Sequence, residues 1–203
     1  AVTKKFPFER ANTTVSAFDM CIACQTESTN PNDRRFHSQT NSCADCGIKL
    51  KVTTSDGKTI VDADSEIIKK VSKFILDGDI VAIKNTNGYL LCCDANNKLT
   101  IERLRAKKKR PTKPFAMLYP SIERVKNDFK LSLSEEKALT SSVSPIIILN
   151  PKESITDLEQ ESIAPNLNQF GVMLPSSALL VLLMDELKIP IIATSGNIHG
   201  SPI

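Results

Sequence analysis

The segment from residue 65 to residue 94 has the clearest pattern of apolar and polar positions in the chain. From Ser65 to Leu76, apolar residues recur every three or four positions, and Gly78 follows the last of them. This spacing predicts an amphipathic helix that ends near residue 76. The next apolar runs, 79–84 and 89–94, are too short for helices and enclose a polar turn. We therefore expect a helix, a strand, a turn and a second strand in this order.

Residues 96–107 continue with a shorter apolar stripe on a strongly basic segment. Leu99, Ile101 and Leu104 have helical spacing, and the helix is expected to stop before Pro111. Further strands are predicted at 115–119, 145–149, 170–174 and 189–193, further helices at 121–127, 134–141 and 177–187, and a charged loop at 150–166. Strands and helices that interleave in this way predict a mixed α/β (α+β) domain.

The composition is that of an ordinary globular protein. The chain has 203 residues, of which 41% are hydrophobic and 24% are charged, and this argues against a fibre or a disordered chain. The longest strongly apolar stretch, 178–184, is far shorter than the roughly 20 residues of a membrane helix. No charged and then apolar leader opens the chain. We therefore expect a cytoplasmic protein that has no membrane partner.

Four of the six cysteines have the spacing of a metal site. Cys21 and Cys24 form one C-x2-C pair, and Cys43 and Cys46 form another after eighteen intervening residues. Each pair offers two thiolates to one side of a tetrahedral Zn2+. The alternatives are two disulfides or four free thiols, but the missing secretory leader favours zinc. A site with four cysteines has no open coordination position, so we expect the zinc to stabilise the fold rather than to react.

The cysteine spacing also suggests how the chain is divided. Residues 1–50 contain few large apolar side chains and could not offset their ordering entropy without a metal. We expect a zinc-finger module at 1–50 and a larger domain at 51–203. That domain is expected to be incomplete at its C-terminus, because the chain ends soon after a strand without a closing element. His37 is expected to have a structural role rather than to be a zinc ligand, and residues 32–35 to form a turn that enters a short strand.

Positive charge is concentrated in one segment. Seven basic residues and no acidic residue lie between residues 103 and 113, although the whole chain has a net charge of only +3. Such a run is compatible with a nucleic acid, with a nucleotide triphosphate or with solvent alone. Pro111 and Pro114 restrict the backbone next to Arg110 and Lys113. This restriction favours positioned phosphate contacts over a freely solvated run.

Two polar turns at the ends of strands are further candidates for a ligand site. Lys84 opens the turn that ends at Gly88, where its ammonium and the backbone amides could bind an anion. Thr194, Ser195 and Asn197 belong to a turn after a buried strand, where open sheets tend to bind ligands. Taken alone, each of the two is equally compatible with an ordinary turn.

Several common catalytic patterns are missing from the sequence. It contains no P-loop motif and no dinucleotide-binding glycine motif, and neither of its two histidines, His37 and His199, adjoins a nucleophile motif. Nucleotidyl transfer requires only basic groups, hydroxyls and usually Mg2+, because it depends on positioning and charge neutralisation. Cys92 and Cys93 are adjacent in a predicted strand, point to opposite faces and are expected to lie in the core.

The order of these motifs resembles the HypF family of hydrogenase maturation carbamoyltransferases over nearly the whole chain. Residues 8–14, the four spaced cysteines and residues 33–43 look like the second of that family's two zinc-finger modules. Residues from about Ser65 onward resemble its YrdC-type domain, with similar segments at 78–84, 93–95, 103–105, 109–111, 113–115, 171–175 and 193–197. Residues 85–88 and 176–180 depart from the family's pattern.

The resemblance implies a fold and an activity. The expected fold is a small four-cysteine zinc module followed by a YrdC-like domain that has a twisted mixed sheet and a concave cavity. The expected enzyme is an ATP-dependent ligase and carbamoyltransferase, in which a carbamoyl group derived from carbamoyl phosphate is adenylated in that cavity. The carbamoyl-adenylate would pass to a downstream domain and to the C-terminal cysteine of a partner protein, on the route to the cyanide ligands of NiFe hydrogenase.

The same resemblance implies roles for individual residues. Lys84, Lys109, Arg110 and Lys113 would hold phosphates, while Thr194, Ser195 and Asn197 would line the adenylate pocket. Cys21, Cys24, Cys43 and Cys46 would bind a structural Zn2+, and ATP would be bound with Mg2+.

Two other functions remain open. One is a threonylcarbamoyl-adenylate synthase of the same fold, which serves tRNA modification; the attached zinc module argues against it. The other is a binding module or regulator that contacts double-stranded RNA through the concave surface and the basic run, or DNA through the zinc module. Salt-sensitive binding of a duplex would favour the regulator.

Overall fold

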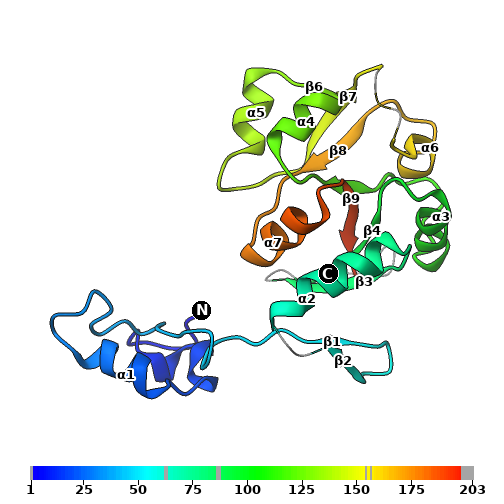
Figure 1. The fold of residues 1–203 in the computed structure, drawn as a ribbon. Helices are drawn as coiled ribbons and strands as arrows, with labels where there is room; N and C mark the ends of the chain where they lie inside the picture. Colours follow the sequence, from blue (N-terminus) through cyan, green and yellow to red (C-terminus); the bar gives the residue numbers. More distant parts are fainter. Residues whose placement is uncertain (1, 62–63, 86–87, 154, 156, 198–203) are drawn as a thin grey trace. The chain divides into compact units, whose positions relative to one another are not determined.

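The chain forms two compact units, Ala1–Asp64 and Ser65–Ile203 (Figure 1). The computed structural model describes residues 2–61, 64–85, 88–153, 155 and 157–197. In this described part of the chain, no helix is long and apolar enough to cross a membrane. The assignment of the zinc module to residues 1–50 stays a prediction.

The first unit contains little regular structure. It has two short 3-10 helices, Arg10–Asn12 and Thr14–Ala17, the helix α1 (Ile22–Thr29), and a small antiparallel sheet of β1 (Val52–Thr53) and β2 (Thr59–Val61). Residues 31–37 form turns, but no described strand follows them before β1, so the strand expected after residues 32–35 is wrong. Asn30 and Asp33 direct this segment into local turns by accepting bonds from nearby backbone amides instead.

Polar contacts rather than apolar packing hold the first unit together. Among its described residues, Cys24 is the only buried hydrophobic residue. The Arg10 guanidinium donates hydrogen bonds to the carbonyls of Gln39 (3.3 Å), Asn41 (2.8 Å) and Phe18. One side chain thus fastens its own segment to two others, at residue 18 and at residues 39–41. A unit with so small a core needs such contacts and a metal to stay ordered.

The helices of the second unit agree with the hydrophobic pattern. The predicted helices correspond to α2 (Asp64–Leu76), α3 (Lys98–Lys107), α4 (Ile122–Asp128), α5 (Leu133–Leu139) and α7 (Ala178–Leu187). Side chains of Asn97, Ser121, Ser132 and Ser177 cap the N-termini of the last four. The predicted loop at 150–166 contains one further short helix, α6 (Gln160–Ile163), which has too few residues to show a period.

Seven strands of the second unit form one mixed sheet (Figure 1). They are β3 (Val81–Asn85), β4 (Gly88–Asp94), β5 (Ala116–Leu118), β6 (Phe129–Lys130), β7 (Ile147–Pro151), β8 (Phe170–Met173) and β9 (Ile191–Ser195). The strand order is β3-β4-β9-β5-β8-β7-β6, with β5 and β8 parallel and the other neighbours antiparallel. The last strand, β9, therefore lies between β4 and β5.

The strand register divides the sheet residues between two faces. Cys93 pairs with Ile192, Ile192 with Met117, and Met117 with Val172, so these four side chains share one face. All four are buried in one hydrophobic cluster with Ile101 and Leu104 of α3, Phe115, Tyr119, Phe129, Leu149 and Phe170. The main core thus lies between this face and α3.

Both adjacent cysteines are buried, as predicted. Cys92 and Cys93 are fully buried in β4, and burial raises the pKa of each thiol to about 12.

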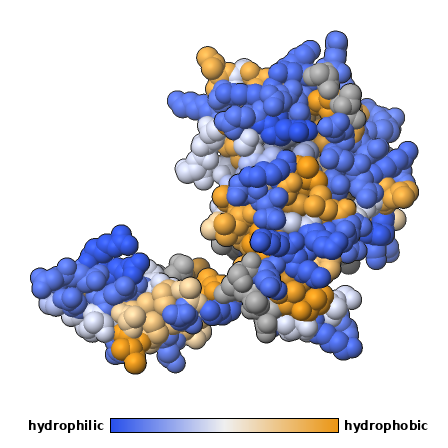
Figure 2. All heavy atoms as spheres, viewed as in Figure 1, coloured by the Kyte–Doolittle hydropathy of each residue, from blue (hydrophilic) through white to orange (hydrophobic). Residues whose placement is uncertain are grey.

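Figure 2 shows a mainly hydrophilic surface on the visible face of the second unit, with apolar side chains interspersed.

Candidate functional site

The four spaced cysteines of the first unit form one compact cluster. Cys21 directly precedes α1, and Cys24 lies in the first turn of that helix. Cys43 and Cys46 lie at a separate turn later in the chain, which we call the second cysteine turn. Sulfur atoms are 3.6 Å apart for Cys21 and Cys43, 3.8 Å for Cys43 and Cys46, and 3.7 Å for Cys46 and Cys24. All four lie within 4.8 Å of one another.

These distances fit a tetrahedral zinc site. Bonds of about 2.3 Å from a zinc ion to four sulfurs place the sulfurs about 3.8 Å apart, whereas a disulfide needs about 2.05 Å. None of the four cysteines forms a disulfide, so the disulfide alternative is wrong. His37 lies outside the cluster, and its backbone amide donates to the carbonyl of Ser28 (2.9 Å). The cluster thus offers four ligands and no open position for catalysis.

The second cysteine turn has a shape that only glycine allows. The Gly47 amide donates to the Cys43 carbonyl at 2.8 Å, and a Cβ atom at Gly47 would lie 2.7 Å from the same oxygen. The Asp45 amide donates to the Cys43 sulfur (3.3 Å). Hydrogen bonds from the backbone of Cys21 and Cys43 lower the pKa of Cys46 to about 6, which favours the thiolate that a metal binds.

A polar network supports the cluster from behind. Asn41 Nδ2 donates to the carbonyl of Cys24 (3.0 Å) and to the carboxylate of Glu27 (3.1 Å). Arg35 holds the same carboxylate through Nη1, which lies 2.7 Å from Oε1. Hydrogen bonds from Asn41 and Arg35 therefore lower the pKa of Glu27. The network fixes the carbonyl of a zinc ligand and links the two cysteine turns.

In the second unit, the basic segment and the last strand lie together. Arg110 Nη1 lies 3.2 Å from Thr194 Oγ1, and the same guanidinium donates to the carbonyls of Lys113 (3.1 Å) and Pro114. Thr194 is buried, and the 84 positions between it and Arg110 are spanned by four strands of the sheet. The basic run and the polar turn at Thr194, which the sequence indicated as two separate candidate sites, thus contact each other directly.

Lys108 makes a second link that the sequence interpretation missed. Its Nζ donates to the carbonyls of Ser195 (2.6 Å) and Asn197 (2.7 Å), and the residue is only 5% exposed. Burial lowers the pKa of Lys108, and the charge of Arg110 lowers it further. The helical period of α3 could have indicated that Lys108 is buried. Lys108 follows Ile101 by seven residues and Leu104 by four, so it lies on the same buried side of the helix.

The end of α3 turns the basic residues toward these partners. The Lys109 amide donates to the Ala106 carbonyl (3.0 Å), and the Arg110 amide donates to the Arg105 carbonyl (3.1 Å). Lys109 has a φ of 49°, so the turn is a Schellman motif whose left-handed position carries lysine instead of glycine. Lysine in this conformation is strained and is tolerated here because the surrounding contacts determine the backbone.

Lys84 lies on the face of the sheet that carries Thr194. Lys84 pairs with Tyr89 across β3 and β4, and Leu91, two residues after Tyr89, pairs with Thr194. Both side chains therefore share the face that α3 covers. The Gly196 amide donates to the Tyr89 carbonyl (2.7 Å), which ties the turn after β9 to β4. Residues 86–87 of the predicted anion-binding turn lie outside the described residues.

Ser195 and Asn197 form a local pair. The Ser195 hydroxyl donates to the Asn197 side-chain oxygen, and the strand register places Ser195 on the opposite face from Thr194. A ligand that contacts both Thr194 and Ser195 must therefore lie at the end of β9 rather than over one face of the sheet.

Three of the predicted phosphate ligands are left with ammonium groups that can bind an anion. The side chains of Lys84, Lys109 and Lys113 are exposed, and their ammonium groups have no hydrogen-bond partner within the described part of the chain. Residues 108–114, between α3 and β5, form what we call the basic loop. A hollow of about 330 Å³ lies beside it, lined by Glu102, Arg105, Ala106, Lys109, Arg110 and Pro111. The concave cavity over the sheet stays a prediction.

The interpretation of the basic run as a solvated face holds for only part of it. Arg105, Lys108 and Arg110 direct their charged groups to backbone carbonyls, while Lys107, Lys109 and Lys113 face solvent. Alternating inward and outward cations do not make the continuous exposed stripe that a duplex contacts.

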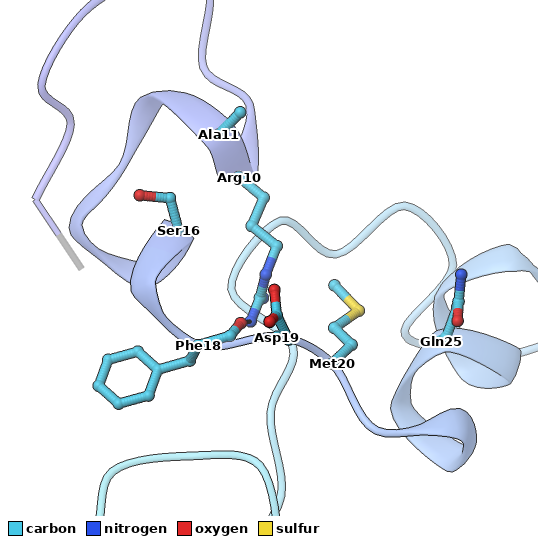
Figure 3. A pocket seen from close by; sticks show the side chains of 7 residues that line it. All are labelled: Arg10, Ala11, Ser16, Phe18, Asp19, Met20 and Gln25. Carbon is cyan, nitrogen blue, oxygen red and sulfur yellow. Dashed lines mark hydrogen bonds between the residues drawn. The ribbon is translucent and has the colours of Figure 1, made fainter.

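A second hollow lies in the first unit and contains none of the predicted site residues. It has a volume of about 410 Å³ and is lined by Arg10, Ala11, Ser16, Phe18, Asp19, Met20 and Gln25 (Figure 3). The Arg10 guanidinium beside it is occupied by backbone carbonyls.

Comparison with known proteins finds a separate family model for each of the two units. The family model Sua5–YciO–YrdC, described as telomere recombination, matches residues 73–203, and the HypF finger model matches residues 20–53. Carbamoyltransferase HypF of Rhodobacter capsulatus is 35% identical over 202 residues, which is 100% of this chain and 26% of that protein. The chain thus spans about a quarter of the length of the curated relatives it matches.

Two solved structures are similar in sequence and fold. A full-length HypF in the phosphate- and nucleotide-bound form has a TM-score of 0.82 and 36% identity, covering 100% of this chain and 26% of that one. T. kodakarensis HypF has a TM-score of 0.86 and 38% identity, covering 98% and 26%. The predicted resemblance is confirmed: this chain belongs to the Sua5–YciO–YrdC family and carries a HypF finger ahead of the family's domain.

Proposed function

We propose that the chain is the carbamoyl-adenylate-forming segment of a HypF-like carbamoyltransferase that serves NiFe hydrogenase maturation. One observation carries this proposal: Arg110 and Lys108 join the basic loop to Thr194 and Ser195 at the end of β9 and to Asn197 in the turn that follows. The strand thus extends two residues into the turn that the sequence predicted. The join brings hydroxyl and amide groups to a loop in which Lys109 and Lys113 are exposed, and a nucleotide requires polar groups and cations of this kind. Similarity to a HypF structure in the phosphate- and nucleotide-bound form supports it.

Each part of a nucleoside triphosphate has a proposed partner. Lys84, Lys109 and Lys113, whose ammonium groups lack partners among the described residues, bind the phosphate chain together with Arg110. Thr194, Ser195 and Asn197 line the adenylate side at the end of β9. Lys108 does not contact the ligand in this arrangement but keeps the carbonyls of the turn in place.

The proposed reaction needs little acid or base chemistry. Hydrolysis of carbamoyl phosphate first gives carbamate and inorganic phosphate. A carbamate oxygen then attacks the α-phosphorus of ATP, and the bond from this phosphorus to the oxygen that bridges it to the β-phosphorus breaks, which gives carbamoyl-AMP and pyrophosphate. Charge develops on the leaving pyrophosphate, so the cations of the loop accelerate the step by neutralising it. Bound Mg2+ would neutralise phosphate oxygens that the lysines do not reach.

The first unit has a supporting role in this proposal. Its zinc stabilises the finger, because a four-thiolate site leaves no position for a substrate. In a longer protein of this kind, the carbamoyl-adenylate would pass to a downstream carbamoyl-transfer domain and then to a partner protein with a C-terminal cysteine. We place this chemistry in the cytoplasm.

The test is release of pyrophosphate from ATP by the zinc-loaded chain. Carbamoyl phosphate, L-threonine with bicarbonate, and neither addition are compared in parallel. Release that depends on carbamoyl phosphate supports the proposal. Release that depends on L-threonine would identify a threonylcarbamoyl-adenylate synthase instead. Salt-sensitive binding of an RNA duplex without any nucleotide turnover would favour the regulator.

A further inference from the structure

Arg105 lies behind the basic loop and contacts three of its carbonyls. Its Nη1 donates to the carbonyls of Arg110 (2.8 Å), Pro111 (3.3 Å) and Lys113 (3.0 Å). Its Nη2 points away from the loop and donates to the carbonyls of Ser162 (2.7 Å) and Ile163 (3.2 Å). One planar guanidinium thus links the loop to the end of α6.

Phe115 fixes the plane of this guanidinium. The ring centroid of Phe115 lies 4.5 Å from Cζ of Arg105 and 4.9 Å from Cζ of Arg110. Phe115 is 1% exposed, and its amide donates to the carbonyl of Ile163 (3.0 Å). Two arginines therefore stack on one buried ring, which fixes their mutual position.

The loop has few other means of keeping its shape. Residues 111–113 belong to no helix or strand, and proline at 111 and 114 removes two backbone donors. The carbonyls of Arg110, Pro111 and Lys113 are satisfied by arginine side chains. Without Arg105, the backbone that carries Arg110 and Lys113 would lose most of the donors that orient it.

We propose that Arg105 is a positioning residue for the phosphate-binding loop: it sets the backbone from which Arg110 and Lys113 reach the ligand, without contacting the ligand itself. This proposal rests on the proposed nucleotide function. The geometry favours arginine over lysine at this position, since a lysine ammonium has three donors at one point and cannot span carbonyls on both sides.

The test compares Arg105→Lys with the wild type in the full zinc-loaded chain. This change keeps the charge and the apolar stem, so the domain is expected to fold with its thermal midpoint shifted by less than a few degrees. The Kd for ATP with Mg2+ is expected to rise about tenfold or more, because a small misplacement of binding groups has large effects. Hydrogen exchange is expected to become faster at the amides of residues 110, 112 and 113 and at the end of α6, where the carbonyls of Ser162 and Ile163 also lose a donor, but not elsewhere in the domain.

Arg103→Lys is the matched control. Arg103 lies in the same helix and also donates to a backbone carbonyl, that of Gly78, but it does not contact the loop. It should leave both the ATP affinity and the loop exchange unchanged. An Arg105→Lys variant that binds ATP as tightly as the wild type, or that exchanges faster throughout the domain, overturns the proposal.

The two proposals fail in different ways. A wild-type chain that does not bind ATP contradicts the proposed function alone. The exchange measurement uses the ligand-free chain, so it still tests whether Arg105 holds the backbone of the loop. A wild-type chain that binds ATP together with an Arg105→Lys variant of equal affinity contradicts only the role of Arg105.

Discussion

Lys108 Nζ lies 2.6 Å from the carbonyl oxygen of Ser195, a residue 87 positions further along the chain. A second carbonyl, that of Asn197, accepts from the same ammonium at 2.7 Å. The contact joins the end of α3 to the end of β9. A buried cation thus builds the candidate site, while its neighbours Lys107 and Lys109 are exposed.

Replacing this cation should affect both stability and binding. Lys108→Met keeps the length of the side chain but leaves two carbonyls without their donor, so we expect a loss of about 1–3 kcal/mol in the free energy of unfolding. The Kd for ATP should rise at least about tenfold, because the turn is no longer held. Denaturant unfolding and titration measure the two effects. Lys107→Met, at an exposed neighbouring position, should change neither; equal effects of both variants would refute a specific contact.

The hydrophobic pattern was sufficient to predict most elements of the second unit but not their order. The period of α2 and the short runs of β3 and β4 are local properties, and they were predicted to within about two residues. The two-residue strand β6 and the four-residue helix α6 are too short to carry a period. The position of β9 between β4 and β5 depends on contacts across the whole domain.

The same distinction applies to the site. The zinc ligands follow from spacing alone, because two C-x2-C turns are a local signal. Contacts such as Lys108 with Ser195 use backbone carbonyls, which every residue has, so no residue type marks them in the sequence. The family resemblance placed Arg110 and Thr194 in one nucleotide site. Their direct contact is seen only in the folded domain, because the two residues are 84 positions apart in the sequence.

The strained turn at Lys109 predicts an exchange of stability for binding. Lys109→Gly removes the cost of a left-handed lysine (φ 49°) and should stabilise the chain by roughly 0.5–1 kcal/mol. It also removes one exposed ammonium, so the affinity for ATP should fall. Lys188→Gly is a suitable comparison, since Lys188 has a φ of 56° at the end of α7. It should stabilise similarly and leave ATP affinity unchanged; a loss of affinity in both variants would contradict the role of Lys109.

Zinc removal should unfold the first unit while the second unit keeps its structure. The first unit buries almost no hydrophobic side chain, whereas the second has its own core. Titration of the full chain with a chelator, followed by hydrogen exchange, should therefore show loss of protection in the first unit only, at residues 2–61. Loss of protection in both units would show that the finger supports the larger domain.

A single methyl group should weaken the zinc site. Gly47→Ala places a Cβ 2.7 Å from the Cys43 carbonyl, and we expect zinc affinity to fall about 10-fold to 100-fold. Gly57→Ala, in the same unit, has open space around its Cβ but a φ of 87°, so it should cost some local stability in the turn between β1 and β2 and leave zinc affinity unchanged. Competition with a chromogenic chelator measures both affinities. Wild-type affinity in Gly47→Ala would contradict the described turn.

Acid should remove the contribution of one helix cap. Ser132 and Glu135 form a capping box at the start of α5, and hydrogen bonds from Ser132 lower the pKa of Glu135. A lowered pKa in the folded state contributes stability above the unfolded value, and this is lost as pH falls through the folded pKa. The wild type should therefore unfold at a higher temperature than Glu135→Gln at pH 7, and the gap should close toward pH 3. A gap independent of pH would contradict the assignment.

The central claim is that this chain binds ATP through the basic loop and the turn after β9. Isothermal titration of the zinc-loaded chain with ATP and Mg2+ tests it most directly, with Lys113→Ala measured beside the wild type. Lys113 is exposed and its ammonium has no described partner, so the variant should fold normally and bind ATP several-fold more weakly. A folded, zinc-loaded wild type that shows no binding at millimolar ATP, or a Lys113→Ala variant with unchanged affinity, would contradict the account.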